Sequence, residues 1–201
     1  MKNGNTFLLG LTGSIGMGKT TTARLFAEAG IPVWSADDTV HKLYEEGGAA
    51  TEAIAGICPD AITDGVVDRE KLKAWISRDS RAIEQIEKAI HPLVEADRQD
   101  FIRTERAPVL VFDIPLLFEK GNETKFDAIA VVTAPPQEQR RRVLERKTMT
   151  EDMFETILAR QMPDVEKRRR ADYVIVTDSL EGVRSQVFDI IDKIRKTTTN
   201  A

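Results

Sequence analysis

A lysine and a threonine end a glycine-rich stretch near the start of the chain. Residues 13–20 match the phosphate-binding pattern G-x-x-x-x-G-K-[ST] at every position. The glycines let the backbone bring its N–H groups up to phosphate oxygens, Lys19 can reach the β- and γ-phosphates of a nucleotide, and Thr20 can bind Mg²⁺ through its hydroxyl. A glycine-rich turn without a ligand is the alternative. The expected nucleotide-binding residues here are Gly13, Ser14, Ile15, Gly16, Met17, Gly18, Lys19, Thr20 and Thr21.

Two elements are needed to position this loop. Residues 7–11 form a short apolar run that is typical of a strand, and residues 19–29 carry apolar side chains on one helical face. A helix that begins at the loop points its positive N-terminal end at the same phosphates. Strand, loop and helix in this order indicate a phosphate site.

Two carboxylates follow the second predicted strand. Residues 31–34 form a short apolar run, and Asp37 and Asp38 come soon after it, at the start of a predicted helix that reaches about residue 46. Ligands of open α/β sheets bind at the carboxyl ends of strands, which favours a catalytic role for these residues. Asp is also a preferred residue at helix starts, so capping explains the same pattern equally well.

A third carboxylate ends the apolar run at residues 109–113, which has the pattern of a central parallel strand. P-loop enzymes place a carboxylate near Mg²⁺ at such a strand end. We therefore expect Mg²⁺ as the cofactor, held by Thr20 and by Asp113, directly or through a water. A turn before Pro115 is the other explanation of Asp113. Leu116, Leu117 and Phe118 come next, either as core residues or as the wall of a substrate cleft.

Five apolar segments in total alternate with helical patterns, the last two at residues 127–132 and 173–176. They predict an α/β fold with a parallel sheet of the P-loop type. Residues 38–106 are mostly helical and too long for an ordinary connection, so we expect a helical insertion. Within it we expect Pro92 to mark a helix boundary directly after His91. His91 would cap or pack at this junction, or else contact the substrate.

A basic segment lies between the last two strands. Residues 137–170 contain ten Lys and Arg against seven Asp and Glu, a net of +3, which leaves −7 for the rest of a chain of net charge −4. Local positive charge on an acidic protein suits a polyphosphate ligand. A solvated helical hairpin is the alternative, and it would account for about half of these arginines.

Composition limits the classes of protein to which the chain can belong. The chain has 201 residues, of which 41% are hydrophobic, and its acidic balance argues against a general nucleic-acid binder. Cys58 is the single cysteine, which excludes an internal disulfide and suggests a buried, inert thiol. Without a membrane-length apolar run or a leader, we expect a soluble cytoplasmic protein with no membrane partner and no obligate protein partner.

Several motifs together resemble one family of P-loop kinases. The P-loop reads GSIGMGKTT, and DIPLLFE at residues 113–119 and QMP at residues 161–163 are more specific. Further matching segments are Val33 to Asp37, DGVVDR at residues 64–69, IHP at residues 90–92, and Lys167, Ala171 and Asp172. In this order, over nearly the whole chain, these segments resemble the dephospho-coenzyme A kinase family.

The resemblance implies transfer of the γ-phosphoryl group of ATP to the ribose 3′-hydroxyl of dephospho-CoA, the last step of coenzyme A synthesis. It implies a core domain at residues 1–37, 107–136 and 171–201, a helical CoA-binding domain at 38–106, and a lid at 137–170. Asp37 matches the family's general base, and Lys19 and Arg140 would stabilise the developing charge. Arg146 would bind ATP. The substrate-binding residues would be His91, Leu116, Leu117, Phe118 and Arg160.

Two positions depart from the family's pattern. Ser35 stands where the family has the first acid of Asp-Ala-Asp, and Thr177 and Asp178 stand where an Asn near the adenine is usual. Two other hypotheses share the P-loop: a nucleoside or nucleotide kinase with another acceptor, and a nucleotide-binding regulatory module without turnover. A small GTPase is excluded, because the chain has no Asn-Lys-x-Asp run.

Overall fold

The structure, a computed structural model, describes residues 6–146 and 149–199. Its contacts divide the chain into two compact units. The first unit comprises the chain up to Trp34 and from Glu105 onward, and the second comprises Ser35–Thr104. Residues 1–5 and 147–148, predicted to belong to the core and the lid, lie outside the described residues, as do 200–201. Because no separate lid is divided off, the three-part assignment stays a prediction.

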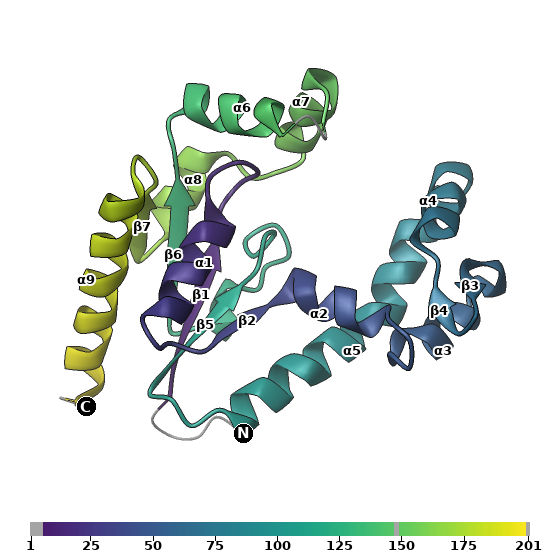
Figure 1. Cartoon of the computed structure of the whole chain (residues 1–201), viewed down its shortest axis with the longest axis horizontal. Helices are drawn as coiled ribbons and strands as arrows, with labels where there is room; N and C mark the ends of the chain where they lie inside the picture. The colour runs from purple at the N-terminus through teal and green to yellow at the C-terminus, as the bar shows by residue number, and fades with distance from the viewer. Residues whose placement is uncertain (1–5, 147–148, 200–201) are drawn as a thin grey trace. The chain divides into compact units, whose positions relative to one another are not determined.

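The first unit contains a five-stranded sheet with the strand order β2-β5-β1-β6-β7 (Figure 1). β1 pairs in parallel with both β5 and β6, and β6 pairs in parallel with β7. The predicted α/β class with a parallel sheet is confirmed. The strands are β1 (Phe7–Thr12), β2 (Val33–Ser35), β5 (Val109–Asp113), β6 (Ala128–Thr133) and β7 (Tyr173–Val176).

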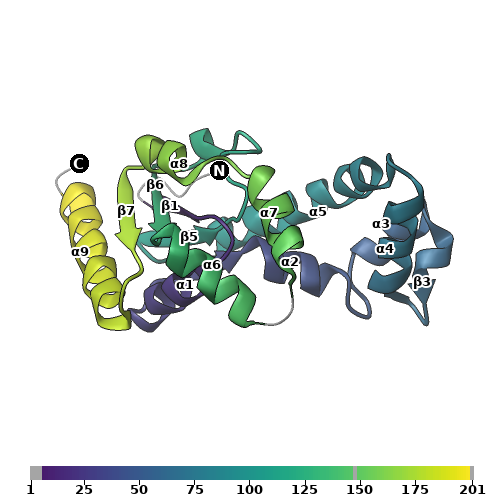
Figure 2. The same ribbon diagram turned by 90° about the horizontal axis from the view of Figure 1, so that it is seen from above.

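Alternate residues of the central strands face two separate layers of packed side chains. Ala130 and Val132 of β6 pack in one core cluster with α1 (Lys19–Glu28) and α9 (Leu180–Thr199), whereas Ile129 and Val131 pack in another. Figure 2 shows α1 and α8 (Asp164–Arg170) on opposite sides of the sheet. Because both faces are covered, β5 and β6 are buried at every residue, which explains their continuous apolar sequence.

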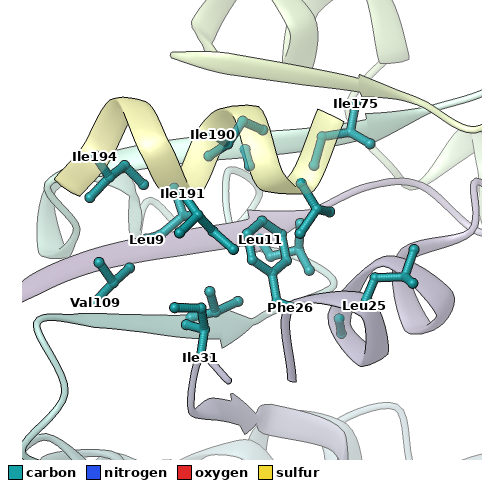
Figure 3. Close-up of a cluster of buried hydrophobic side chains, with 14 of the residues drawn as sticks. Leu9, Leu11, Leu25, Phe26, Ile31, Val109, Ile175, Ile190, Ile191 and Ile194 are labelled. Carbon is teal, nitrogen blue, oxygen red and sulfur yellow. The ribbon is translucent and has the colours of Figure 1, made fainter. Parts of the chain in front are cut away.

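Helix α9 closes the first layer with the predicted amphipathic face. In Figure 3 Ile191 of the helix lies beside Leu9 and Leu11, and Ile190 and Ile194 belong to the same buried cluster. The predicted buried residues of the helix are all at most 5% exposed: Val183, Val187, Ile190, Ile191 and Ile194.

The described part of the basic segment between β6 and β7 contains the helices α6 (Pro136–Glu145), α7 (Glu151–Ala159) and α8. A short 3-10 helix, η2 (Glu123–Lys125), lies between β5 and β6. Among the described residues, no helix is both long enough and apolar enough to span a membrane.

The second unit is mainly helical and has its own core. Two short antiparallel strands, β3 (Ile62–Thr63) and β4 (Val66–Val67), form a hairpin in this unit. Asp64 and Gly65 join them with φ values of 49° and 78°, as a type I′ turn requires. Around this hairpin, Ile54, Leu72 and Ile90 pack in the core of the unit. Its elements are α2 (Ala36–Leu43), α3 (Ala50–Ala55), η1 (Pro59–Ala61), β3 (Ile62–Thr63), β4 (Val66–Val67), α4 (Arg69–Arg78) and α5 (Ala82–Thr104).

The predicted helix boundary at Pro92 is wrong. Pro92 lies inside α5, a single helix of 23 residues. A proline inside a helix removes one hydrogen bond and costs about 3 kcal/mol. Ile90, Leu93 and Val94 on either side of it pack in the core of the second unit, and this tertiary packing offsets the cost. His91 is consequently an exposed residue within a continuous helix and does not lie at a junction.

Candidate active site

The glycine-rich loop joins Thr12, the last residue of β1, to Lys19, the first residue of α1. Gly16 and Gly18 have φ values of 77° and 92°, in the left-handed region that favours glycine. Gly16 is also tightly packed, because a Cβ atom there would lie 2.6 Å from Cγ2 of Val143 on α6. The loop therefore needs glycine at this position both for its turn and for its contact with α6.

Helix α1 begins at this loop without a capping side chain, since its N-cap residue is Gly18. The first four N–H groups of a helix lack partners within the helix, and the helix dipole gives this end a partial positive charge. Such an end binds phosphate and other anions. The sequence therefore places an anion site at the point where Lys19 begins the helix.

Lys19 and Asp113 form an ion pair between α1 and the end of β5. The side chain of Lys19 is 14% exposed and that of Asp113 is 9% exposed, so water screens the pair only weakly. Asp113 is the last residue of β5 and lies beside Leu11 of β1 in the sheet register. The strand-end position predicted for this carboxylate is observed, and its role at Mg²⁺ stays a prediction.

The oxygen ligands near the loop have the chemistry that Mg²⁺ prefers. Thr20 offers an exposed hydroxyl in the first turn of α1, and Asp113 offers a carboxylate. No cluster of three or more His, Cys, Asp or Glu side chains suited to a metal ion occurs among residues 6–146 and 149–199. Mg²⁺ needs no such cluster, because it commonly keeps several waters and uses one or two protein oxygens together with substrate phosphates. The donor set fits Mg²⁺ bound together with a nucleotide.

The arginines of α6 differ in where they point. Arg142 donates from Nη2 to the carbonyl oxygen of Thr177 at 2.6 Å and from Nη1 to its hydroxyl at 2.8 Å. Hydrogen bonds from Arg141 and Arg142 lower the pKa of Glu138 to about 2. Arg140, which was predicted to be catalytic, pairs instead with Glu151 at the start of α7 and is half exposed.

A cavity of about 220 Å³ opens beside the first turn of α1. Gly18 and Thr21 of the P-loop segment line it, and so do Arg142, Arg146 and Asp178. The structure thus places Arg146, which was predicted to bind ATP, beside the P-loop. Arg142 lines the same cavity but was not among the predicted site residues.

Thr177 fastens the loop after β7 to the P-loop. Its hydroxyl lies 2.8 Å from the carbonyl oxygen of Met17, accepts from Arg142, and packs close to Gly18. This hydroxyl is therefore already engaged at the position where the family usually has Asn. Within the P-loop, Ser14 and Met17 are buried residues.

The apolar residues after β5 divide into core and surface. Leu117 is fully buried and Phe118 is 5% exposed, and both pack against Ile129 and Val131. Leu116 is 37% exposed. For Leu117 and Phe118 the structure shows the core alternative, and only Leu116 offers a large part of its side chain to a ligand. Arg160, in the loop that follows α7, is also exposed.

The two carboxylates after β2 lie in the first turn of α2, in the second unit. The N-cap of this helix is Ser35, whose Oγ accepts a hydrogen bond from the Asp38 N–H at 3.2 Å. Ser35 thus performs the capping that was the alternative explanation for the aspartates. Asp37 is exposed.

Comparison with known proteins indicates a family. A family model described as dephospho-CoA kinase matches residues 7–181. The chain is 54% identical over 191 residues to a dephospho-CoA kinase of Cereibacter sphaeroides, an alignment that covers 95% of this chain and 97% of that protein. It is 53% identical over 190 residues to one of Ruegeria pomeroyi, covering 94% of this chain and 96% of the other.

A solved structure is similar to this chain over most of its length. A crystal structure of TT1252 from Thermus thermophilus is similar to this chain with a TM-score of 0.83 and 29% sequence identity. The similarity covers 93% of this chain and 96% of that chain.

Proposed function

Because the chain belongs to the dephospho-CoA kinase family, we propose that its site transfers the γ-phosphoryl group of ATP to the ribose 3′-hydroxyl of dephospho-CoA. The products are coenzyme A and ADP, and the reaction is the last step of coenzyme A synthesis. The observation that carries the proposal is a complete P-loop at a strand–helix junction, with Lys19 beside a carboxylate at the end of β5.

The P-loop and α1 account for binding of the phosphates. Backbone N–H groups of the loop and of the first helical turn bind phosphate oxygens, and Lys19 adds a positive charge at the β- and γ-phosphates. Thr20 and Asp113, directly or through a water, would hold Mg²⁺, which would supply positive charge to offset the charge of the phosphates. The protein acts mainly by positioning and by charge stabilisation, because a loose phosphoryl-transfer transition state needs little covalent help.

Asp37 is the proposed general base. It lies two residues after the end of β2, and Ser35 caps α2, so the carboxylate of Asp37 is not required as the helix cap. In this role Asp37 orients the ribose hydroxyl and accepts its proton as the phosphoryl group is transferred.

The cavity beside α1 is the proposed site for the nucleoside end of ATP. Its walls include Gly18 and Thr21, next to the phosphate site, together with Arg142 and Arg146. A nucleotide with its phosphates on the P-loop would therefore reach this cavity with its base and ribose. The two arginines add positive charge near the phosphates, as the net charge of the basic segment predicts.

Three exposed residues are the proposed contacts with the acceptor. Leu116, Arg160 and His91 remain the proposed contacts with dephospho-CoA, and each has an exposed side chain. Arg140 remains a proposed catalytic residue, which requires its ion pair with Glu151 to open. A cytoplasmic location also stays a proposal.

An ADP-release assay tests the proposal against its rivals. The wild-type protein and Lys19→Ala are incubated with ATP, Mg²⁺ and one acceptor at a time: dephospho-CoA, adenosine or a nucleoside monophosphate. We expect ADP release with dephospho-CoA, a product phosphorylated at the ribose 3′-hydroxyl, and loss of release in the variant. Preference for a nucleoside or nucleotide would indicate another kinase, and ATP binding without product would indicate a regulatory module.

A further inference from the structure

Both backbone polar groups of one P-loop residue are bonded to glutamine side chains from outside the loop. Nε2 of Gln139 on α6 donates to the carbonyl oxygen of Ile15 at 2.7 Å. Oε1 of Gln161, in the loop after α7, accepts from the N–H group of Ile15 at 3.1 Å. Two side chains that are 22 positions apart in the sequence thus hold the same residue.

The held residue lies in a turn that has two possible forms. The N–H group of Met17 donates to the carbonyl oxygen of Ser14 at 3.2 Å, which makes Ile15 and Gly16 the central residues of a four-residue turn. The φ value of 77° at Gly16 is that of the third residue of a type II turn. In a type I turn the peptide between the two central residues is turned over, and glycine at this position permits both forms.

The bond from Gln139 distinguishes the two forms. It holds the carbonyl oxygen of Ile15 toward α6, and the described backbone contains no cis peptide bonds. In a trans peptide the C=O and N–H groups point in opposite directions, so the N–H group of Gly16 points away from α6. Turning the peptide over would break the bond from Gln139 and direct the N–H group of Gly16 toward α6 instead.

We propose that Gln139 and Gln161 are positioning residues that hold the Ile15–Gly16 peptide in the orientation that presents the Gly16 N–H group to the phosphates of ATP. Both side chains are neutral, so they contribute orientation to the phosphate site without adding charge. The inference rests on the proposed binding of ATP at this loop. Neither glutamine is needed as a ligand of the nucleotide.

The burial of Gln139 fits this role. The residue is 4% exposed, and burying its side-chain amide away from water costs free energy unless the amide is hydrogen-bonded in the protein. An apolar side chain of similar length would fill the same space on α6. The polar amide is therefore explained by its bond to Ile15 and not by packing alone.

Gln161 is held in turn by a buried ion pair. The next residue, Met162, donates its N–H group to Oε1 of Glu119 at 2.8 Å, and Nζ of Lys167 lies 2.9 Å from the same oxygen. Lys167 is fully buried. Burial acts to raise the pKa of Glu119, but the hydrogen bonds from Lys167 and Met162 hold it below its usual value. The loop that carries Gln161 is thereby fastened to α8 and to the segment after β5.

Hydrogen exchange of individual amides tests the geometry in the free protein. In Gln161→Met the Ile15 amide should exchange faster than in the wild type, whereas Gln161→Glu keeps an acceptor oxygen and should keep the protection. Gln186→Met is the matched control, because Gln186 bonds the N–H and C=O groups of Val176 in the same way on β7. In this control the Val176 amide should exchange faster, and exchange of the Ile15 amide should be unchanged.

Steady-state kinetics test the function. Losing one neutral hydrogen bond corresponds to roughly threefold to tenfold in an equilibrium constant. We expect Gln139→Met to raise KM for ATP by that factor and to leave KM for dephospho-CoA unchanged. A merely structural role would instead lower the active fraction, and so kcat, with both KM values unchanged, and that result would overturn the proposal.

The two proposals fail in different ways. If the wild type does not phosphorylate dephospho-CoA, the proposed function fails, while the exchange experiment still tests the hydrogen bonds on Ile15. If the wild type is active but the folded Gln139→Met and Gln161→Met variants keep both wild-type exchange at Ile15 and wild-type KM for ATP, the positioning role is wrong.

Discussion

Lys19 and Asp113 form an ion pair although they lie 94 positions apart in the sequence. The pair is possible because β1 and β5 are neighbouring parallel strands, so the loop after one strand meets the end of the other. Asp113 holds the ammonium group of Lys19 at the start of α1, where the phosphates are expected to bind. If ATP binds as proposed, its phosphates would compete with Asp113 for Lys19, so this ion pair would open beside the proposed Mg²⁺ site.

The first prediction concerns this pair. Lys19→Met should lower turnover by at least about 10²-fold, because groups that stabilise transition-state charge contribute about 10²–10³-fold each. It should also lower the free energy of unfolding, since it removes one partner of an ion pair whose side chains are only 14% and 9% exposed. Steady-state ADP release and urea denaturation measure the two effects.

A double variant separates stability from catalysis. In Lys19→Met/Asp113→Asn the carboxylate charge is also removed, so we expect much of the lost stability to return while turnover stays low. Near-normal turnover in a folded Lys19→Met protein would contradict the P-loop assignment.

The second prediction concerns the basic segment, residues 137–170, which we expect to close over ATP. Its two ends are already fastened in this structure, by Gln139 to Ile15 and by Met162 and Lys167 to Glu119. Hydrogen exchange should therefore slow most in α7 (Glu151–Ala159) when a non-hydrolysable ATP analogue binds, and less in α8. Unchanged exchange across the whole segment would favour the alternative of a solvated hairpin.

The sequence predicted the sheet well because its signals are local. The apolar run at residues 109–113 is buried at every position, and the P-loop pattern alone fixes which strand and helix surround the phosphate site. Both signals follow from residue type and spacing, without knowledge of distant contacts. For Leu117 and Phe118 the sequence allowed either a core position or a place in the wall of a substrate cleft, because residues after a strand end can face either one.

The sequence could not show which arginine of α6 contacts Thr177. Arg140, Arg141 and Arg142 are consecutive, and successive residues of a helix point about 100° apart, so the rotation of α6 against the sheet decides which one meets Thr177. Gln139 and Gln161 meet at Ile15 through tertiary packing alone. The QMP motif nevertheless marked Gln161 as part of the family's pattern.

The third prediction is a pH dependence of stability at Glu138. Hydrogen bonds from Arg141 and Arg142 lower the pKa of this carboxyl group to about 2, from 4.5 for an unperturbed Glu. A lowered pKa in the folded protein means that the stabilisation is fully present above pH 4.5 and is lost as the pH falls toward 2. Glu138→Gln should therefore lower Tm at neutral pH, and the difference from the wild type should shrink below about pH 4.5.

Thermal denaturation at pH values from about 7 down to about 3 measures this difference. Glu155→Gln, an exposed change on α7, serves as the control and should show little effect at any of these pH values. A Tm difference for Glu138→Gln that stays constant over the whole range would contradict the role of the two arginine hydrogen bonds.

The last prediction separates Asp37 from Asp113. If Asp37 is the base, Asp37→Asn should keep affinity for ATP and lower kcat by at least about 10²-fold, because general bases contribute about 10²–10⁴-fold. Asp38→Asn is the matched control, since Asp38 is an exposed aspartate in the same turn of α2 and should be nearly fully active. Asp113→Asn should instead raise the Mg²⁺ concentration needed for half-maximal rate, because Asp113 lies at the strand end beside Lys19.

Titration of Mg²⁺ at saturating ATP and dephospho-CoA distinguishes the two aspartates. A high concentration of Mg²⁺ can restore a weakened metal site by mass action. It cannot take over the role of Asp37, which in the loose transition state is mainly to orient the hydroxyl group. We therefore expect Asp113→Asn to recover activity and Asp37→Asn to stay slow. If high Mg²⁺ restores Asp37→Asn and leaves Asp113→Asn inactive, the assignments of base and metal ligand are reversed.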